Sequence, residues 1–125
     1  AGQTARTLGA KSVGLVAPYL PYMRQDRVFR PGEAVTSVHF AKWISSCVDW
    51  LVTIDPHLHR WKALSDIYSI PSVAAHAAPA MAEWIKNHVD RPLLIGPDAE
   101  SEQWVSDIAV RAGGAGGRHR PYRNE

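Results

Sequence analysis

This sequence has one cysteine, a small net charge and no long apolar run. These features argue against an internal disulfide, a nucleic-acid partner and a membrane span, respectively. The single cysteine, Cys47, cannot form an internal disulfide, and its place in an apolar helical pattern is typical of a buried thiol in a reducing compartment. The 14 Lys and Arg residues against 12 Asp and Glu leave a formal charge of +2, which is too small to indicate a nucleic-acid partner. No apolar run approaches the roughly 20 residues that cross a bilayer, and the N-terminus lacks the apolar core of a signal peptide. We therefore expect a cytoplasmic protein that binds neither nucleic acid nor membrane.

The sequence does contain the composition of a globular domain and an alternation of β and helical patterns. With 125 residues, 46% of them hydrophobic, it predicts one domain with a buried core. Thr36 or Ser37 is placed to cap a helix. Strands are predicted at 13–19, 50–54, 70–75 and 92–95, and helices at 35–50, 79–88 and 101–112. This order is typical of an α/β fold in which helices flank a parallel sheet.

The two ends of the chain differ from the rest. The N-terminus starts without Met and reads as the end of a helix that stops at Gly9, so we expect the chain to be part of a longer sequence. The C-terminal "GGAGGRHRPYRNE" places four glycines in five residues before a basic segment poor in apolar residues. That composition predicts a flexible tail over 114–125, which leaves 1–113 as the folded domain.

Polar residues follow three of the predicted strands, at the point where each strand ends. The segments are "PYMRQDR" after the first strand, "DPHLHR" after the second and "GPDAESE" after the strand at 92–95. Ligands of open parallel sheets bind outside the carboxyl ends of the strands, where helix N-termini direct their amides. The three segments together predict a phosphate or nucleotide site at a strand edge.

Each polar segment also has a simpler interpretation. Arg24 and Arg27 would serve equally well to solvate a surface turn. Asp98 could cap the helix that follows it. His57 and His59 alternate, so on an extended segment they would point to opposite sides, which disfavours a zinc site built from this pair. One histidine with a carboxylate and water molecules instead suits magnesium held together with phosphates.

With these segments in view, the sequence resembles the ribose-phosphate pyrophosphokinases, also called phosphoribosyl pyrophosphate synthetases. The most specific part is "PYMRQDRVFRPGEAVT", which is similar to that family's Arg-Gln-Asp loop with its trailing Arg-Pro. Three further segments follow in the family's order: "VTIDPHLHR", "YSIPSVAAHAAPAMAEWI" and "LLIGPDAES". The resemblance implies a phosphoribosyltransferase-like, Rossmann-like domain that is incomplete in this chain.

The resemblance also implies a reaction and the residues that serve it. Family members transfer the diphosphoryl group of ATP, as its Mg²⁺ complex, to ribose 5-phosphate, and they assemble as homo-oligomers. Carried over residue by residue, Arg24, Gln25 and Asp26 would line the ATP site, and His57 would contact the ATP phosphates and the metal. Asp98 would stand near a second metal position beside ribose 5-phosphate. The reaction relies mostly on positioning and charge neutralisation, which suits this residue set.

Departures from the family pattern limit what the chain is expected to do alone. Pro56 and the "LHRW" that follows His57 differ from the family, and "GPDAES" lacks a glycine pair that lets backbone approach phosphate. The catalytic Lys-Arg loop has only a poor counterpart in Arg118 and Arg120, so the catalytic residues stay unassigned. We expect the isolated chain to bind nucleotide weakly and to catalyse little or nothing. The alternative is a non-catalytic nucleotide-binding or subunit-interaction homologue.

Overall fold

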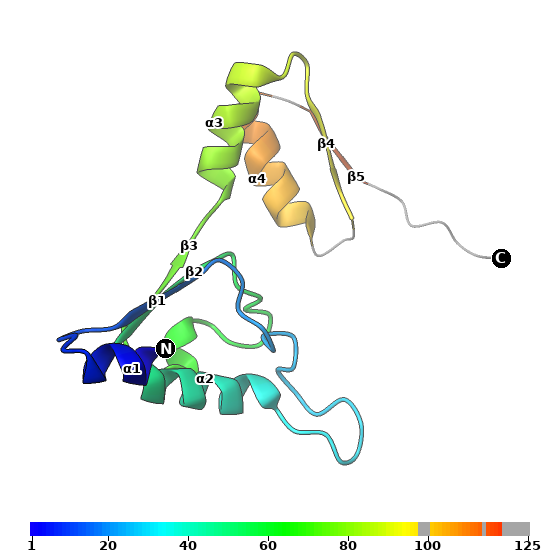
Figure 1. The fold of residues 1–125 in the computed structure, drawn as a ribbon. Coiled ribbons are helices and arrows are strands. Elements are labelled where there is room, and N and C mark those ends of the chain that lie inside the picture. The colour runs from blue at the N-terminus through cyan, green and yellow to red at the C-terminus, as the bar shows by residue number, and fades with distance from the viewer. Residues whose placement is uncertain (98–100, 114, 119–125) are drawn as a thin grey trace. The chain divides into compact units, whose positions relative to one another are not determined.

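The computed structural model describes residues 1–97, 101–113 and 115–118, and these form two compact units (Figure 1). The first unit runs over Ala1–Ala75 and the second over His76–Glu125. Each unit has its own parallel sheet and its own hydrophobic cluster, so each is described by itself.

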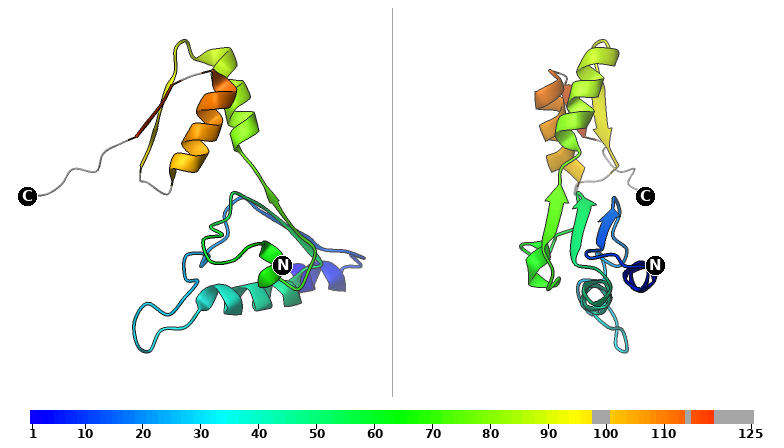
Figure 2. Two further views of the ribbon diagram at one scale, coloured as in Figure 1. Left: turned by 180° about the vertical axis from the view of Figure 1, so that it is seen from behind. Right: turned by 60° about the vertical axis from the view of Figure 1, so that its left-hand side comes forward.

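The first unit is built on a three-stranded parallel sheet in the order β1-β2-β3 (Figure 2). Strands β1 (Gly14–Ala17), β2 (Trp50–Ile54) and β3 (Ser72–Ala75) are short and apolar. Helices α1 (Gly2–Thr7) and α2 (Thr36–Cys47) lie on one side of these strands, and the 3₁₀ turn η1 (Leu64–Asp66) comes before β3. This arrangement is the predicted parallel α/β sheet with helices packed against it.

The two faces of the first sheet are unequal. Leu51 and Thr53 of β2 are buried on the helix side, where Leu51 joins the main core cluster. The alternate positions carry Val16, Val52 and Val73, which lie in register across the three strands. Val16 is 65% exposed and Val73 is 57% exposed. The core lies on the helix side and is formed by Leu20, Met23, Ala41, Ile44, Leu51, Leu64 and Tyr68.

The second unit packs two helices against a two-stranded parallel sheet. Helix α3 (Ala78–His88) precedes β4 (Leu93–Gly96), and α4 (Glu102–Ala112) precedes β5 (Ala115–Arg118). Strand β4 pairs with β5 from Leu93↔Ala115 to Gly96↔Arg118. Small side chains let the helices approach closely; the cluster consists of Ala78, Ala82, Ile108 and Ala112.

Two sequence expectations differ from this architecture. Residues 115–118, expected to belong to a flexible tail, form β5, because parallel pairing with β4 gives their backbone groups partners. Within the described residues, β4 pairs with β5 and with no strand of the first sheet, so the third polar segment does not follow a strand of the sheet that carries the first two. The rest of the tail, residues 114 and 119–125, lies outside the described residues.

The start of α2 also differs from the expectation of a serine or threonine cap. Val35 occupies the cap position, and no side-chain cap bond is found there among the described residues. Ser37, the second residue of the helix, is buried, and its hydroxyl donates to the Gln25 carbonyl at 3.0 Å. Thr36 donates instead to the Ala34 carbonyl. The serine therefore anchors the preceding loop to the helix, which a local capping rule does not anticipate.

An ion pair joins α1 to the beginning of the sheet. The Arg6 guanidinium donates to Asp49 Oδ1 at 2.7 Å, and the Val13 N–H donates to Asp49 Oδ2 at 2.8 Å. The Arg6 hydrogen bond, followed by the Val13 amide, lowers the pKa of Asp49 below its ordinary value of 3.8. Because the folded-state pKa is the lower one, this carboxylate stabilises the fold above about pH 4 and stops doing so as the pH falls through the folded value.

We expect Asp49→Asn to lower the urea midpoint of unfolding at about pH 7, and this loss to shrink as the pH falls through the lowered pKa of the wild-type carboxyl. Asp90→Asn is the matched control, because Asp90 and its partner Arg91 are at least nine-tenths exposed and their pair is weak. A loss in Asp49→Asn that does not shrink as the pH falls would contradict this assignment.

Candidate functional site: the loops after β1 and β2

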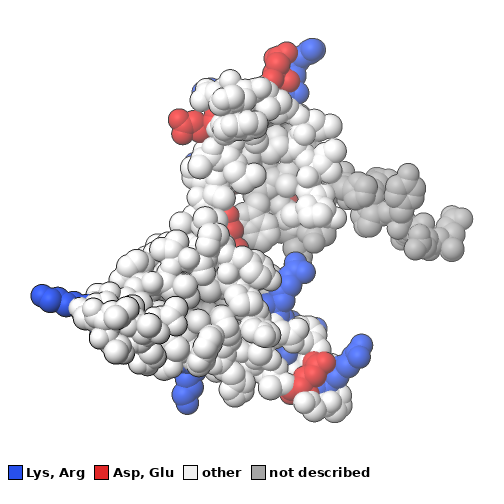
Figure 3. Space-filling view, viewed as in Figure 1, with Lys and Arg blue, Asp and Glu red and all other residues white. Residues whose placement is uncertain are grey.

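Two polar loops leave the same edge of the first sheet. Strands β1 and β2 are parallel neighbours whose last paired residues are Ala17 and Thr53. The chain that follows β1 and the chain that follows β2 therefore start side by side at the carboxyl edge. Figure 3 shows Lys and Arg side chains on the side of this unit that carries the loop between β1 and α2. This is the edge where open α/β sheets bind ligands.

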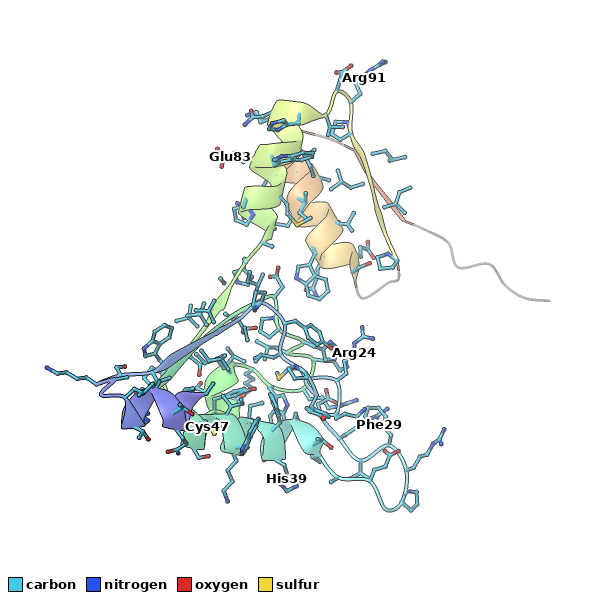
Figure 4. The ribbon with its side chains drawn as sticks, viewed as in Figure 1. Arg24, Phe29, His39, Cys47, Glu83 and Arg91 are labelled. Atoms are coloured by element: carbon cyan, nitrogen blue, oxygen red, sulfur yellow. The ribbon has the colours of Figure 1, made fainter. Side chains whose placement is uncertain are left out.

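The loop after β1 has alternating inward and outward residues. Leu20, Met23 and Asp26 are spaced by three and are all buried, while Arg24 and Gln25 between them are exposed. A turn produces this spacing, since Tyr22 has a φ of 64° and its carbonyl accepts from the Gln25 N–H at 2.8 Å. Figure 4 labels Arg24 on this loop. The two outward side chains are thus held on an anchored turn.

The backbone of Gln25 is fixed from a second side. Its carbonyl accepts from both the N–H and the hydroxyl of Ser37, at 3.2 and 3.0 Å, at the start of α2. Ser37 is almost fully buried, so these bonds are sheltered from water. The position of the loop relative to α2 is therefore defined at the residue next to Arg24.

The distal part of the loop is held by its own contacts. Glu33 Oε2 accepts from the N–H groups of Phe29 and Arg30, both at 3.1 Å. The Arg27 guanidinium lies over the Phe29 ring at 4.6 Å from its centroid. Gly32, with a φ of 91°, supplies the backbone conformation that the tip needs. Arg27 and Arg30 are exposed here, which makes them useful comparisons for Arg24.

Asp26 and Arg60 join the two loops. Asp26 Oδ1 lies 3.4 Å from Arg60 Nε, and the side chains are 4% and 39% exposed. Asp26 comes from the loop after β1, and Arg60 comes from the segment after β2. The sequence assigned Asp26 to the ATP site, whereas its carboxylate is buried beneath the loop and paired with a residue that sequence reasoning did not single out. No local signal identifies Arg60, because its partner is far away in the sequence.

The segment after β2 is not an extended strand. Strand β2 ends at Ile54, and Asp55 has a φ of 40°. The rings of His57 and His59 consequently stack on each other, with centroids 5.8 Å apart and planes 25° apart. The expectation that they point to opposite sides was therefore wrong. His57 is half-buried and His59 is exposed, so the two histidines differ in environment.

Aromatic side chains near the site have mixed roles. Tyr22, Phe40 and Trp43 form a series of tilted ring contacts, with centroids 5.2 and 5.8 Å apart, along the start of α2. Trp61, which directly follows "DPHLHR", packs half-buried against the main core. Its position favours a structural role.

Comparisons with known proteins point to one family. No protein-family model matches the chain. The curated ribose-phosphate pyrophosphokinase of Methanobrevibacter smithii is 36% identical over 106 residues, which are 83% of this chain and 35% of that protein. The enzyme of the same name from Methanopyrus kandleri is 32% identical over 111 residues, 87% of this chain and 37% of that protein. The chain belongs to the ribose-phosphate pyrophosphokinase family.

A solved structure supports the fold of this family. The crystal structure of phosphoribosylpyrophosphate synthetase from Mycobacterium smegmatis matches with a TM-score of 0.72, covering 97% of this chain and 42% of that one at 20% sequence identity. The expected phosphoribosyltransferase-type fold is thereby confirmed for a partial domain. The chain spans about a third of the length of the curated ribose-phosphate pyrophosphokinases it matches.

The metal ligands expected from the family are only partly described. His57 lies on the segment after β2, whereas Asp98 falls outside the described residues. Among residues 1–97, 101–113 and 115–118, no three His, Cys, Asp or Glu side chains gather closely enough to hold a metal. His57 alone fits a magnesium ion that arrives already bound to phosphates, since Mg²⁺ keeps water and takes few protein ligands.

The end of β4 shows why its polar segment begins with glycine. Gly96 is buried, and an added Cβ would collide with Ser101 Oγ and lie 2.9 Å from Val105 Cγ2 at the beginning of α4. Glycine therefore permits the close approach of strand and helix before the Asp98 segment.

No helix in the described part of the chain is both long and apolar enough to span a membrane.

Proposed function

We propose that this chain carries the ATP-phosphate-binding half of a ribose-phosphate pyrophosphokinase site. In the complete reaction, the diphosphoryl group of Mg-ATP passes to ribose 5-phosphate and gives phosphoribosyl pyrophosphate and AMP. The observation that carries the proposal is the edge of the first sheet, where the Asp26–Arg60 pair joins the loop of Arg24 and Gln25 to the segment of His57.

The proposed roles follow from the chemistry of each side chain. Arg24 is exposed on an anchored turn, and its planar guanidinium suits bidentate contact with phosphate oxygens. Gln25 supplies amide hydrogen bonds beside it. His57 contributes one nitrogen to the magnesium–phosphate complex, while Asp26 positions the loop from below. When it is bound with ATP, Mg²⁺ neutralises phosphate charge, which is most of what this transfer needs.

The isolated chain is proposed to bind Mg-ATP without turnover. Its sequence has no good counterpart of the family's Lys-Arg loop, and its Asp98 segment lacks the glycine pair. Ribose 5-phosphate would then be bound mainly by other parts of a full-length enzyme. We also propose a homo-oligomeric state, for which the exposed valines on the open face of the first sheet offer apolar surface.

A calorimetric titration of Mg-ATP, run beside an assay of AMP release with ribose 5-phosphate, tests the proposal. We expect measurable binding and no AMP. Absence of binding at millimolar Mg-ATP would overturn the nucleotide site and leave a subunit-interaction homologue. AMP release would overturn the proposed inactivity of the isolated chain.

A further inference from the structure

We infer that Arg60 is a positioning residue whose pairing with buried Asp26 sets the nucleotide affinity of the edge formed by the two loops. The inference rests on the proposed function for its ligand, but its structural part can be tested without any ligand. Arg60 would not contact ATP; it would act through the place in which it holds Arg24 and Gln25.

The first step is the burial of the Asp26 carboxylate. Its side chain is only 4% exposed, and a buried charge needs a partner to offset the loss of hydration. Arg60 Nε, at 3.4 Å from Oδ1, is the cationic group that the structure places there. Without Arg60, Asp26 would be drawn toward water, and the turn that contains it would have to open.

The second step is the mechanical consequence for the loop. Asp26 follows Gln25 and Arg24 directly, and these neighbours face outward while it faces inward. Ser37 fixes the same turn to α2, but only through the Gln25 carbonyl. The Asp26–Arg60 pair is the ion pair that ties this turn to the segment of His57, beside the apolar contacts that Leu58 makes with the core cluster. Removing the pair loosens the polar part of this connection without removing Arg24, Gln25 or His57, the residues proposed to contact Mg-ATP.

The third step is that the pair is incompletely satisfied. Asp26 Oδ2 is buried with no hydrogen-bond partner among the described residues, and so is the Nε1 donor of Trp61, the residue after Arg60. A buried acceptor or donor without a hydrogen-bond partner lowers the stability of the folded state. Any movement that gave these two atoms partners would restore that stability. The pair therefore holds the loops with part of its hydrogen-bonding capacity unused, which makes the loop sensitive to substitutions at either end.

The experiment compares Arg60→Gln, Asp26→Asn and the double variant by titration with Mg-ATP. We expect each single variant to bind about five- to tenfold more weakly and the double variant to bind no more weakly than either, because the two changes break one contact. Arg27→Gln is the matched control, since it removes the same charge from an exposed position of the same site; it should stay within about twofold.

The sign of the Asp26→Asn effect separates positioning from direct contact. If Arg60 bound phosphate itself, removing the neighbouring negative charge would leave ATP affinity unchanged or raise it. A lower affinity in Asp26→Asn is expected if the pair positions the loop, and its non-additivity with Arg60→Gln separates this role from an independent contact of Asp26 with ATP. Unchanged or tighter binding in that variant would overturn the inference. Arg60→Lys keeps the charge and should recover part of the affinity, and it serves where Arg60→Gln fails to fold.

Hydrogen exchange of the free protein gives a readout that does not depend on ATP. The Gln25 N–H, bonded to the Tyr22 carbonyl, should exchange faster in Arg60→Gln than in wild type, while the Val89 N–H at the C-cap of α3 should not change. Failure of wild type to bind Mg-ATP would count against the proposed function alone. Unchanged exchange at Gln25 would overturn the positioning role whether or not ATP binds.

Discussion

We expect Arg24→Ala to weaken Mg-ATP binding by about 10- to 100-fold, because it would remove the proposed charge-assisted hydrogen bond to phosphate, worth about 1.5–3 kcal/mol. Arg24 is exposed on a turn whose next residue is fixed to Tyr22 and Ser37, so little freedom has to be lost when it meets phosphate. Isothermal titration calorimetry on the folded chain gives the dissociation constant directly.

Arg30→Ala is the control for that result. Arg30 lies on the same loop, is exposed and carries the same charge, but its backbone is held at the tip by Glu33. Its loss should change the dissociation constant by no more than about twofold at physiological salt, since the remaining effect is screened Coulomb attraction. Equal effects of the two substitutions would mean that the loop attracts ATP by diffuse charge and that Arg24 has no special position.

The sheet of the first unit could be predicted well because its signals are local. Strand β2 has the predicted bounds, 50–54, because a run of β-favouring apolar residues stops at Asp55. Helix α3 begins beside Pro79, whose fixed φ suits a first turn. In both cases a residue beside the element or within its first turn marks one of its boundaries.

The contacts that define the site could not be predicted, because each depends on a partner distant in sequence. Ser37 looks like a cap, yet the Gln25 carbonyl competes for its hydroxyl. The histidine pair looks alternating, yet Asp55 turns the chain through the left-handed region that Asp tolerates better than most residues. The Asp26–Arg60 pair exists only once β1 and β2 lie side by side. The sequence names candidate site residues, which stay predictions, but it does not show which of them are exposed and which are buried.

The second prediction concerns the stacked histidines, of which His57 is half-buried and His59 is exposed. His57→Phe should weaken Mg-ATP binding by about tenfold, because it removes the ring nitrogen proposed to meet the magnesium–phosphate complex. His59→Phe should have an effect of less than about twofold, since His59 is exposed and not matched to the family position. Phenylalanine keeps an aromatic ring at either position, so the stack at 5.8 Å can persist in both variants.

The metal dependence of binding decides what His57 does. ATP is titrated once in magnesium and once in EDTA, and the two dissociation constants are compared. If His57 contacts the magnesium complex, these constants should differ less in His57→Phe than in wild type, because only the magnesium form loses a ligand. His59→Phe should leave that difference as in wild type. A reversed order of the two variants would assign the role to His59, which faces the same side because Asp55 bends the chain. An equal, metal-independent loss in both would mean that the stacked pair shapes the segment after β2 and provides no ligand.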